Sequence, residues 1–193
     1  MNLTFDEDTH TYRLDGVPVP SVTQILHRAG LIDDTWFTRY SAERGSRVHL
    51  ALRYLDEDRL RDETVSPYEQ GFVDAYKRFL ADTDFVPALI EKRVAHEVYR
   101  YAGTLDRTGS LGGPFGGAMC LIDIKTGHAQ PWAALQTAAY AACLPKGAKY
   151  RRFALELRGD GTYRLIEHRD WGRDFRVFLA ALEIAAWKGE QER

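Results

Sequence analysis

The sequence predicts an α/β protein of the α+β type, in which a mixed central β-sheet is flanked by helices. From residue 85 onward, the patterns follow in the order strand, strand, strand, helix, strand, strand, and helical patterns precede them. Residues 118–125 are mostly apolar, as expected of a strand that is covered on both faces. The 193 residues contain no linker rich in Pro, Gly or Ser, so we expect one domain with a sizeable core.

We divide the expected domain 1–193 into an N-terminal hairpin with helices (1–84), a central core (85–168) and a C-terminal helix (169–193). The first of these parts begins with a predicted hairpin, whose strands are residues 3–6 and 11–14. A short helix follows, because Ser21 can cap its start and Gly30 can close it.

Two longer helices complete the N-terminal part. The first begins after Asp33 or Asp34 and carries His49, and its helically spaced apolar residues are Trp36, Phe37, Tyr40, Val48, Ala51, Leu52 and Leu55. Residues 56–62 are rich in charge and predict a solvated loop. Ser66 and Pro67 then begin the second helix. We assign its aromatic stripe to the core: Tyr68, Phe72, Tyr76, Phe79 and Leu80.

The remaining elements are predicted by turn residues and by changes of period. In chain order they are an extended segment over 85–98, a strand before the glycine-rich turn 112–117, a strand over 118–125, a helix from Pro131 to about Cys143, a hairpin of 150–157 with 163–168, and a final helix capped by Asp170. The side chains expected to point inward from the final helix are Trp171, Phe175, Phe178, Leu179, Leu182 and Ala186.

Three charged residues stand out in the predicted core. Asp123 and Lys125 lie two positions apart on the apolar strand and must point the same way, because side chains alternate across a strand. Asp106 lies near the end of the preceding strand. Charged groups on buried strands are costly unless they pair with one another or bind a metal ion. The other interpretation of these residues is a surface ion pair on an edge strand.

Four short motifs occur in a distinctive order and spacing. They are Gly45-Ser46-Arg47-Val48-His49, Asp106, Asp123-Ile124-Lys125 and Gln136-Thr137-Ala138-Ala139-Tyr140. Together they resemble the active-site series of the PD-(D/E)XK nuclease superfamily, and specifically its RecB-like, phage-type exonuclease branch. The opening segment through Pro20-Ser21-Val22-Thr23-Gln24 is also similar to phage and prophage members, so the resemblance covers roughly residues 3–168.

The resemblance implies a restriction-endonuclease-like αβββαβ core and makes residues 85–168 the catalytic core of a nuclease domain. It implies that Mg²⁺ or Mn²⁺ is bound by the Asp106 and Asp123 carboxylates, the His49 imidazole and the Ile124 backbone carbonyl. Carboxylate oxygens suit both ions, whereas a nitrogen ligand is less natural for Mg²⁺. His49 has a second interpretation, as a packed core residue.

Further residues receive roles from the same resemblance. Lys125 would hold and polarise the attacking water or stabilise phosphate charge, and Gln136 and Tyr140 would bind a substrate phosphate or orient Lys125. Related phage enzymes often have a glutamate near the position of Glu91, which makes Glu91 either a metal ligand or a neighbour of the ligands. If His49 binds metal as a neutral ring, activity should fall below about pH 6.5, the ordinary pKa of histidine.

Substrate contacts are left open by the sequence. Arg44 and Arg47 share the helix of His49 and are candidates for binding the DNA backbone, with ordinary surface charge as the alternative. The same two interpretations apply to a second group of basic residues: Arg39, Lys146, Lys149, Arg151 and Arg152. Trp36 and Trp132 can stack on a base or pack in the core, and we favour the core.

Composition argues against several classes of protein. A net charge of −2 argues against a protein that coats nucleic acid, but a nuclease needs only a local basic patch. No stretch approaches the 18 apolar residues of a membrane span, and the N-terminus lacks the pattern of a secretory signal. The two cysteines, Cys120 and Cys143, indicate reduced thiols in a cytoplasmic protein and exclude a four-cysteine iron–sulfur cluster within the chain.

The sequence therefore predicts a metal-dependent DNA exonuclease of phage-type recombination or DNA processing. Its partners would be DNA and a single-strand annealing or other recombination protein. A structure- or sequence-specific endonuclease of the same fold is one alternative, and a non-catalytic nucleic-acid-binding module with a decayed site is another. The intact set of Asp106, Asp123, Lys125 and His49 speaks against decay. A metal-dependent hydrolase of small molecules would be expected to carry a His-Glu-x-x-His pattern, which the sequence lacks.

Overall fold

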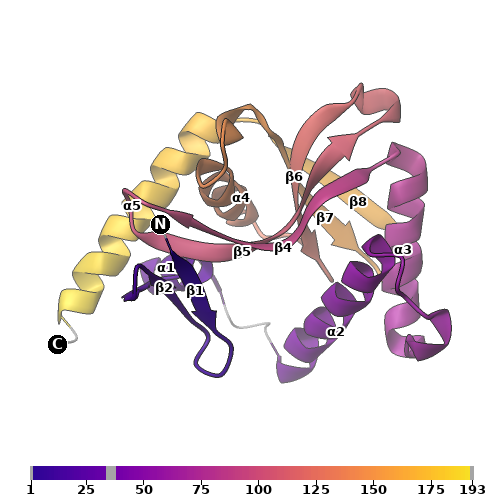
Figure 1. Ribbon diagram of the computed structural model, residues 1–193, viewed down its shortest axis with the longest axis horizontal. Coiled ribbons are helices and arrows are strands. Elements are labelled where there is room, and N and C mark those ends of the chain that lie inside the picture. Colours follow the sequence, from indigo (N-terminus) through magenta and orange to yellow (C-terminus); the bar gives the residue numbers. More distant parts are fainter. Residues whose placement is uncertain (1, 34–37, 192–193) are drawn as a thin grey trace.

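The computed structural model describes residues 2–33 and 38–191. Its larger sheet consists of β4 (Val86–His96), β5 (Tyr101–Leu111), β6 (Ala118–Lys125), β7 (Arg151–Leu157) and β8 (Tyr163–His168). These five strands are hydrogen-bonded in sequence order, and helices cover both faces of the sheet (Figure 1). The predicted fold class, a mixed sheet flanked by helices, is confirmed.

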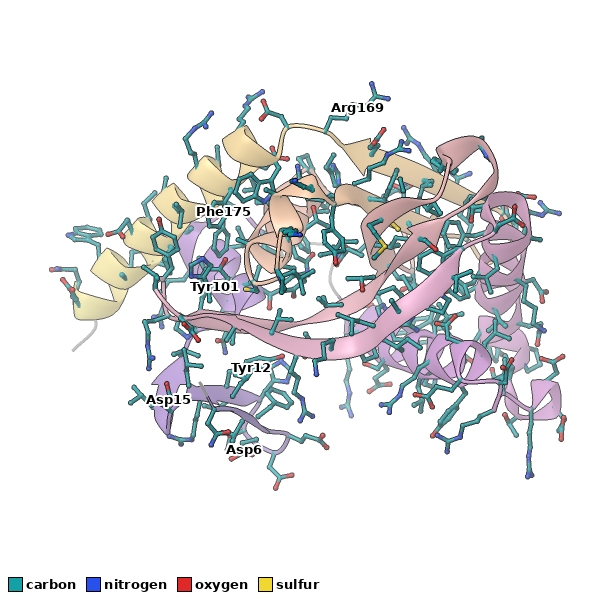
Figure 2. All side chains as sticks on the ribbon, turned by 45° about the horizontal axis from the view of Figure 1, so that its top comes forward. Asp6, Tyr12, Asp15, Tyr101, Arg169 and Phe175 are labelled. Atoms are coloured by element: carbon teal, nitrogen blue, oxygen red, sulfur yellow. The ribbon has the colours of Figure 1, made fainter. Side chains whose placement is uncertain are left out.

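A smaller sheet is formed by β1 (Leu3–Asp6), β2 (Thr11–Leu14) and β3 (Val17–Val19), which confirms the predicted hairpin. It packs on the long β4–β5 hairpin through Tyr12, Leu14 and Val19, which share a buried cluster with Ala95 and Ala102. Tyr12 lies between the two sheets (Figure 2), and its hydroxyl is 2.8 Å from Thr104 Oγ1.

The first helix, α1 (Val22–Ala29), has the ends that the sequence predicts. Ser21 Oγ accepts a hydrogen bond from Gln24 N, and the Gln24 side chain accepts one from Ser21 N, so the two residues form a capping box. Gly30 closes the helix at φ +85°, a left-handed conformation that glycine adopts without steric cost.

The second helix, α2 (Arg39–Asp56), begins later than predicted. Thr38 caps it through a reciprocal pair of hydrogen bonds with Ser41, so Asp33 is not its cap. Three residues of the predicted helix start, Asp34, Trp36 and Phe37, lie outside the described residues. The polar capping box at Thr38 marks where the described helix begins.

The third helix, α3 (Pro67–Thr83), starts as predicted, with Ser66 as its cap and Pro67 in the first turn. Phe72, Tyr76 and Phe79 are buried, as expected of a core stripe. Tyr68 is 76% exposed, so its assignment to the core was wrong. It stands in the first turn of the helix, next to the cap.

Helix α4 (Ala133–Ala142) connects the two strands of the sheet that run parallel. β4, β5 and β6 are antiparallel neighbours, β6 pairs with β7 in parallel, and β7 pairs with β8 antiparallel. A parallel pair needs a long crossover, and α4 provides it between β6 and β7. The element order α3–β4–β5–β6–α4–β7 is the αβββαβ order that the resemblance implies.

Two apolar cores lie on opposite faces of the larger sheet. Ile122 and Ile124 of β6 pack with α2 and α3, whereas Leu121 packs with α1, α4 and the last helix, α5 (Trp171–Gln191). Successive residues of β6 from Cys120 to Ile122 thus contribute to different cores, which explains why this part of the strand is apolar on both faces. Within the described residues there are also three short 3₁₀ turns: Asp62–Thr64, Gly113–Phe115 and Gly147–Lys149.

Helix α5 starts where Asp170 Oδ1 accepts a hydrogen bond from Arg173 N, as predicted. Phe178 is fully buried against Tyr101 of β5, and Phe175 stacks on Trp171 and on His96 of β4. Ala186 is exposed and was wrongly assigned to the inward face, which instead uses Ala181 and Ala185. No helix within the described ranges is both long and apolar enough to cross a membrane.

Candidate active site

Three elements bring His49, Glu91 and Asp106 together. Their candidate ligand atoms all lie within 4.8 Å of one another. His49 Nδ1 of α2 is 3.4 Å from Glu91 Oε1 of β4 and 3.7 Å from Asp106 Oδ1 of β5. A cluster of two carboxylates and an imidazole can hold a divalent cation.

Helix α2 positions His49 through its packing. Val48 and Leu52 are fully buried against the core that contains Ile122 and Ile124 of β6. This packing carries the His49 ring to the end of β6, where Nε2 lies 3.2 Å from the Ile124 carbonyl oxygen. The carbonyl that the resemblance names as a ligand is therefore next to His49.

Glu91 has an unusual backbone conformation for a residue inside a strand. Its φ is +45°, in the left-handed region that non-glycine residues rarely adopt. Its neighbours Ile90 and Lys92 keep their register with β5, opposite Arg107 and Leu105. A left-handed residue costs about 1–3 kcal/mol and persists only where its surroundings hold it. Here its carboxylate contacts both His49 and Arg107.

A second group of charges lies beside the first. Asp106 Oδ2 accepts a short hydrogen bond of 2.6 Å from Ile124 N, which connects β5 to β6 next to the site. Asp123 and Lys125 share a side of β6, as predicted, and Lys125 Nζ lies 2.8 Å from Asp123 Oδ2. Asp123 thus pairs with Lys125 and is not among the three clustered residues.

Helix α4 holds Lys125 from the other side. Gln136 Oε1 accepts a hydrogen bond of 3.0 Å from Lys125 Nζ, and Gln136 Nε2 donates one of 3.3 Å to the Tyr140 hydroxyl. Gln136 and Tyr140 are one turn apart, so they occupy one face of the helix, and both are buried. The indole of Trp132 lies against Lys125, with its ring centre 4.7 Å from Nζ.

The clustered charges alter one another's pKa. Burial acts to lower the pKa of His49, but the Asp106 and Glu91 carboxylates outweigh it and raise the pKa to about 9. Burial, together with the Asp123 and Glu91 charges, raises the pKa of Asp106 to about 6. Burial also acts to raise the pKa of Glu91, but its bonds to His49 and Arg107 outweigh this and lower it.

The predicted substrate arginines have partners within the protein. Arg44 Nη2 donates to the Thr126 carbonyl at 2.8 Å, just after Lys125, and Arg47 Nε donates to Glu69 Oε1 at 3.0 Å. Arg152 was wrongly placed with the surface charges, because its side chain is 1% exposed and pairs with Asp174 of α5.

A cavity of about 460 Å³ opens beside the site. His49, Glu91 and Asp106 line it, as do Tyr140 and residues of the small sheet such as Phe5. Two further arginines also line it, Arg53 of α2 and Arg93 of β4, each about half exposed. A ligand in this cavity would contact the three clustered side chains and the small sheet together.

Sequence reasoning missed Arg107 and misjudged Asp56. Arg107 follows Asp106 on β5, is fully buried, and donates from Nε to Asp56 Oδ2 at 2.6 Å and from Nη1 to Glu91 Oε1 at 2.8 Å. Asp56 was expected in a solvated loop, but it ends α2 and its side chain is 1% exposed. A charged residue inside a predicted strand needs a partner of opposite charge. Applied to Arg107, this rule would have indicated that a carboxylate lies next to it.

Comparisons with known proteins add little to this geometry. No protein-family model matches the chain, and neither does any curated protein. Among solved structures the chain is similar to the alkaline exonuclease LHK-Exo from Laribacter hongkongensis, with 16% identity and a TM-score of 0.39 over 89% of this chain and 92% of that one. The complex of LHK-Exo with dAMP gives 16% identity and a TM-score of 0.40 over 90% and 93%. Similarity at this level assigns neither family nor activity.

Proposed function

We propose that this chain is a metal-dependent deoxyribonuclease of the PD-(D/E)XK superfamily, in its RecB-like, phage-type branch. One observation carries the proposal: the ligand atoms of His49, Glu91 and Asp106 converge within 4.8 Å, next to the ion pair of Asp123 and Lys125. These residues come from three of the four sequence motifs, with Glu91 in addition. A pure binding module has no need of such a set.

The charges of the site suit a divalent cation. The carboxylates of Asp56, Glu91, Asp106 and Asp123 face the cations of Arg107 and Lys125, which leaves a charge of −2 once His49 has lost its proton to bind a metal ion. Mg²⁺ or Mn²⁺ would neutralise it. We assign the metal to His49, Glu91 and Asp106, with Asp123 and the Ile124 carbonyl as the adjoining ligands.

An Mg²⁺ or Mn²⁺ ion held by these residues would activate a water at neutral pH and would stabilise negative charge on the phosphate. The chain supplies Lys125, which Asp123 and Gln136 hold at the edge of the site. From there its ammonium donates to the attacking water or to a phosphate oxygen. Since Gln136 and Tyr140 are 6% and 5% exposed, we assign them to orienting Lys125 and not to binding phosphate.

The test is incubation with end-labelled linear DNA and with closed circular DNA, each with Mg²⁺, Mn²⁺ or EDTA. Release of labelled nucleotides from the linear DNA alone, abolished by EDTA, is the result we expect of an exonuclease. Cleavage of the circle would identify the endonuclease alternative, because an exonuclease needs an end. Binding of DNA with no cleavage under any metal would support the non-catalytic module and overturn the proposal.

We further propose that DNA processing of phage type is the setting of this activity, with a single-strand annealing or other recombination protein as partner. This part of the proposal depends on the sequence resemblance alone. Co-purification of the chain with a single-strand annealing protein would test it separately from the nuclease assay.

A further inference from the structure

A buried arginine connects the end of helix α2 to the candidate metal ligands. Arg107 is among the largest side chains that are fully buried. Its Nε donates to Asp56 Oδ2 at 2.6 Å, and its Nη1 donates to Glu91 Oε1 at 2.8 Å and to the Asp106 carbonyl oxygen at 2.8 Å. The guanidinium therefore contacts two of the three clustered residues directly.

Asp56 offsets the charge of Arg107. A buried guanidinium is costly unless carboxylates surround it. Asp56 is buried too, and its two carboxylate oxygens accept hydrogen bonds from the Tyr76 hydroxyl at 3.0 and 3.1 Å. With Asp56 held in this way, Arg107 does not depend on Glu91 alone for its counter-charge. Glu91 remains able to bind a second cation.

The position of Glu91 suits an arginine partner, whose guanidinium is a planar fork. Its left-handed backbone is strained, and Oε1 is the carboxylate oxygen that contacts both Arg107 and His49. The planar fork of an arginine can donate in two fixed directions at once, whereas a lysine ammonium acts as a point charge. Arg107 can thus bind Asp56 and Glu91 simultaneously, which fixes the direction of Glu91.

We propose that Arg107, held by Asp56, is a positioning residue that aims the Glu91 carboxylate at the divalent metal. The inference rests on the proposed function, in that it assumes a metal at His49, Glu91 and Asp106. Arg107 itself touches neither metal nor substrate. Its effect is transmitted through Glu91, and Asp56, on the far side of the guanidinium, contributes to metal affinity without contacting the site.

The test is calorimetric titration of Mn²⁺ into the wild-type chain and into Arg107→Lys. We expect the dissociation constant for Mn²⁺ to rise about 10–100-fold in the variant, as is usual when a partner of a metal ligand is lost. The matched control is Arg152→Lys, because Arg152 is an equally buried arginine that pairs with Asp174 of α5. This control should lose stability while keeping the wild-type Mn²⁺ affinity.

A double-mutant cycle separates positioning from a general loss of structure. If Arg107 acts through Glu91, adding Arg107→Lys to Glu91→Gln should weaken Mn²⁺ binding little beyond Glu91→Gln alone. If Arg107→Lys does not fold, Asp56→Asn takes its place in the cycle, since asparagine keeps an acceptor for Arg107. We expect Asp56→Asn to weaken Mn²⁺ binding as well, because the uncompensated guanidinium then draws the Glu91 charge away from the metal.

Wild-type Mn²⁺ affinity in Arg107→Lys or in Asp56→Asn, or losses that add fully with Glu91→Gln, would overturn the inference. In that case a wild-type chain that binds Mn²⁺ and cleaves DNA would leave the proposed function standing. A wild-type chain that binds no Mn²⁺ would remove the proposed function itself, so the two failures are distinguishable.

Discussion

The surroundings of His49 change its pKa and, with it, the pH dependence that the sequence predicts. Its ordinary pKa of about 6.5 led to the expectation that activity falls below that pH. In the structure the neighbouring carboxylates raise the pKa to about 9, so in the metal-free protein a proton occupies the ring at neutral pH. Metal binding must displace this proton, and Mn²⁺ affinity should increase up to about pH 9.

The raised pKa values predict a pH dependence of stability. A group whose folded pKa is raised stabilises the protein fully below its unfolded pKa, and this contribution is lost as the pH rises through the folded pKa. For His49 the loss runs from about pH 6.5 to about pH 9, and for Asp106 from about pH 4 to about pH 6. In EDTA we expect the free energy of unfolding to fall by roughly 1–3 kcal/mol between pH 6.5 and pH 9.

Urea unfolding at the two pH values, for wild type and His49→Gln, measures this effect. The variant lacks the titrating ring, so its stability should change less over the same range. Equal pH dependence in both proteins would show that other groups cause it.

The Tyr140 ring leaves no room for a side chain at position 103, so we predict that glycine is required there. A Cβ at this position would lie 2.6 Å from Tyr140 Cε1, and the Tyr140 ring is buried. We expect Gly103→Ala to destabilise the protein by about 1–3 kcal/mol and to reduce cleavage, because Tyr140 supports Gln136. Urea unfolding checks the first effect.

Gly45→Ala is the matched control for that substitution. Among the residues that the structure describes, its Cβ would meet only Thr126 Oγ1, at an ordinary 3.6 Å, and the position is helical. Alanine at position 45 should raise the free energy of unfolding by about 0.5–1 kcal/mol. A loss of stability in Gly45→Ala equal to that in Gly103→Ala would contradict this account of Gly103.

At the scale of elements, the side-chain pairs of the candidate site on β6 and on α4 were predicted, because both patterns are local. Alternation on a strand places Asp123 beside Lys125, and the helical repeat places Gln136 beside Tyr140. The start of α2 and the surroundings of Asp56 were mispredicted, since both depend on other residues. Thr38 makes a capping box with Ser41, and Asp56 is buried by Arg107, 51 positions later.

The two charged residues of β6 should have separable effects. We expect Asp123→Asn and Lys125→Met each to lower the cleavage rate by roughly 10²–10⁴-fold. Mn²⁺ affinity should fall in Asp123→Asn, which removes a carboxylate charge. It should be retained in Lys125→Met, because this variant keeps the Asp123 carboxylate and removes only the ammonium that pairs with it. Calorimetric Mn²⁺ titration of both variants decides this. An equal loss of affinity in the two would show that their assigned roles are wrong.

At the scale of the whole molecule, the sequence predicted the fold class and the elements from residue 85 onward. It could not predict that Glu91 adopts a left-handed backbone or that a buried Arg107 reaches across to α2. Neither feature has a periodic signal, since each results from contacts between strands and a helix that are distant in sequence. The strained backbone of Glu91 and the buried ion pairs of Arg107 are therefore features that sequence patterns left out.

Divalent metal should stabilise the whole fold. Ions that bind only the folded protein stabilise it by mass action, by about 2.7 kcal/mol at 100 times the dissociation constant. For a chain of this size that corresponds to a rise in Tm of roughly 5–10 °C. Thermal unfolding followed by circular dichroism, with Mn²⁺ and with EDTA, measures it. A Tm indifferent to both would count against any metal site.

The central claim is that His49, Glu91 and Asp106 form one divalent-metal site. Calorimetric titration of Mn²⁺ into the wild-type chain and into Asp106→Asn tests it most directly, since asparagine preserves the acceptor for Ile124 N. The control is Asp15→Asn, an exposed turn carboxylate outside the cluster, at a left-handed position that asparagine tolerates. We predict saturable Mn²⁺ binding in the wild type and in Asp15→Asn, with affinity lower by at least about tenfold in Asp106→Asn. Equal Mn²⁺ affinity in all three proteins would contradict the claim.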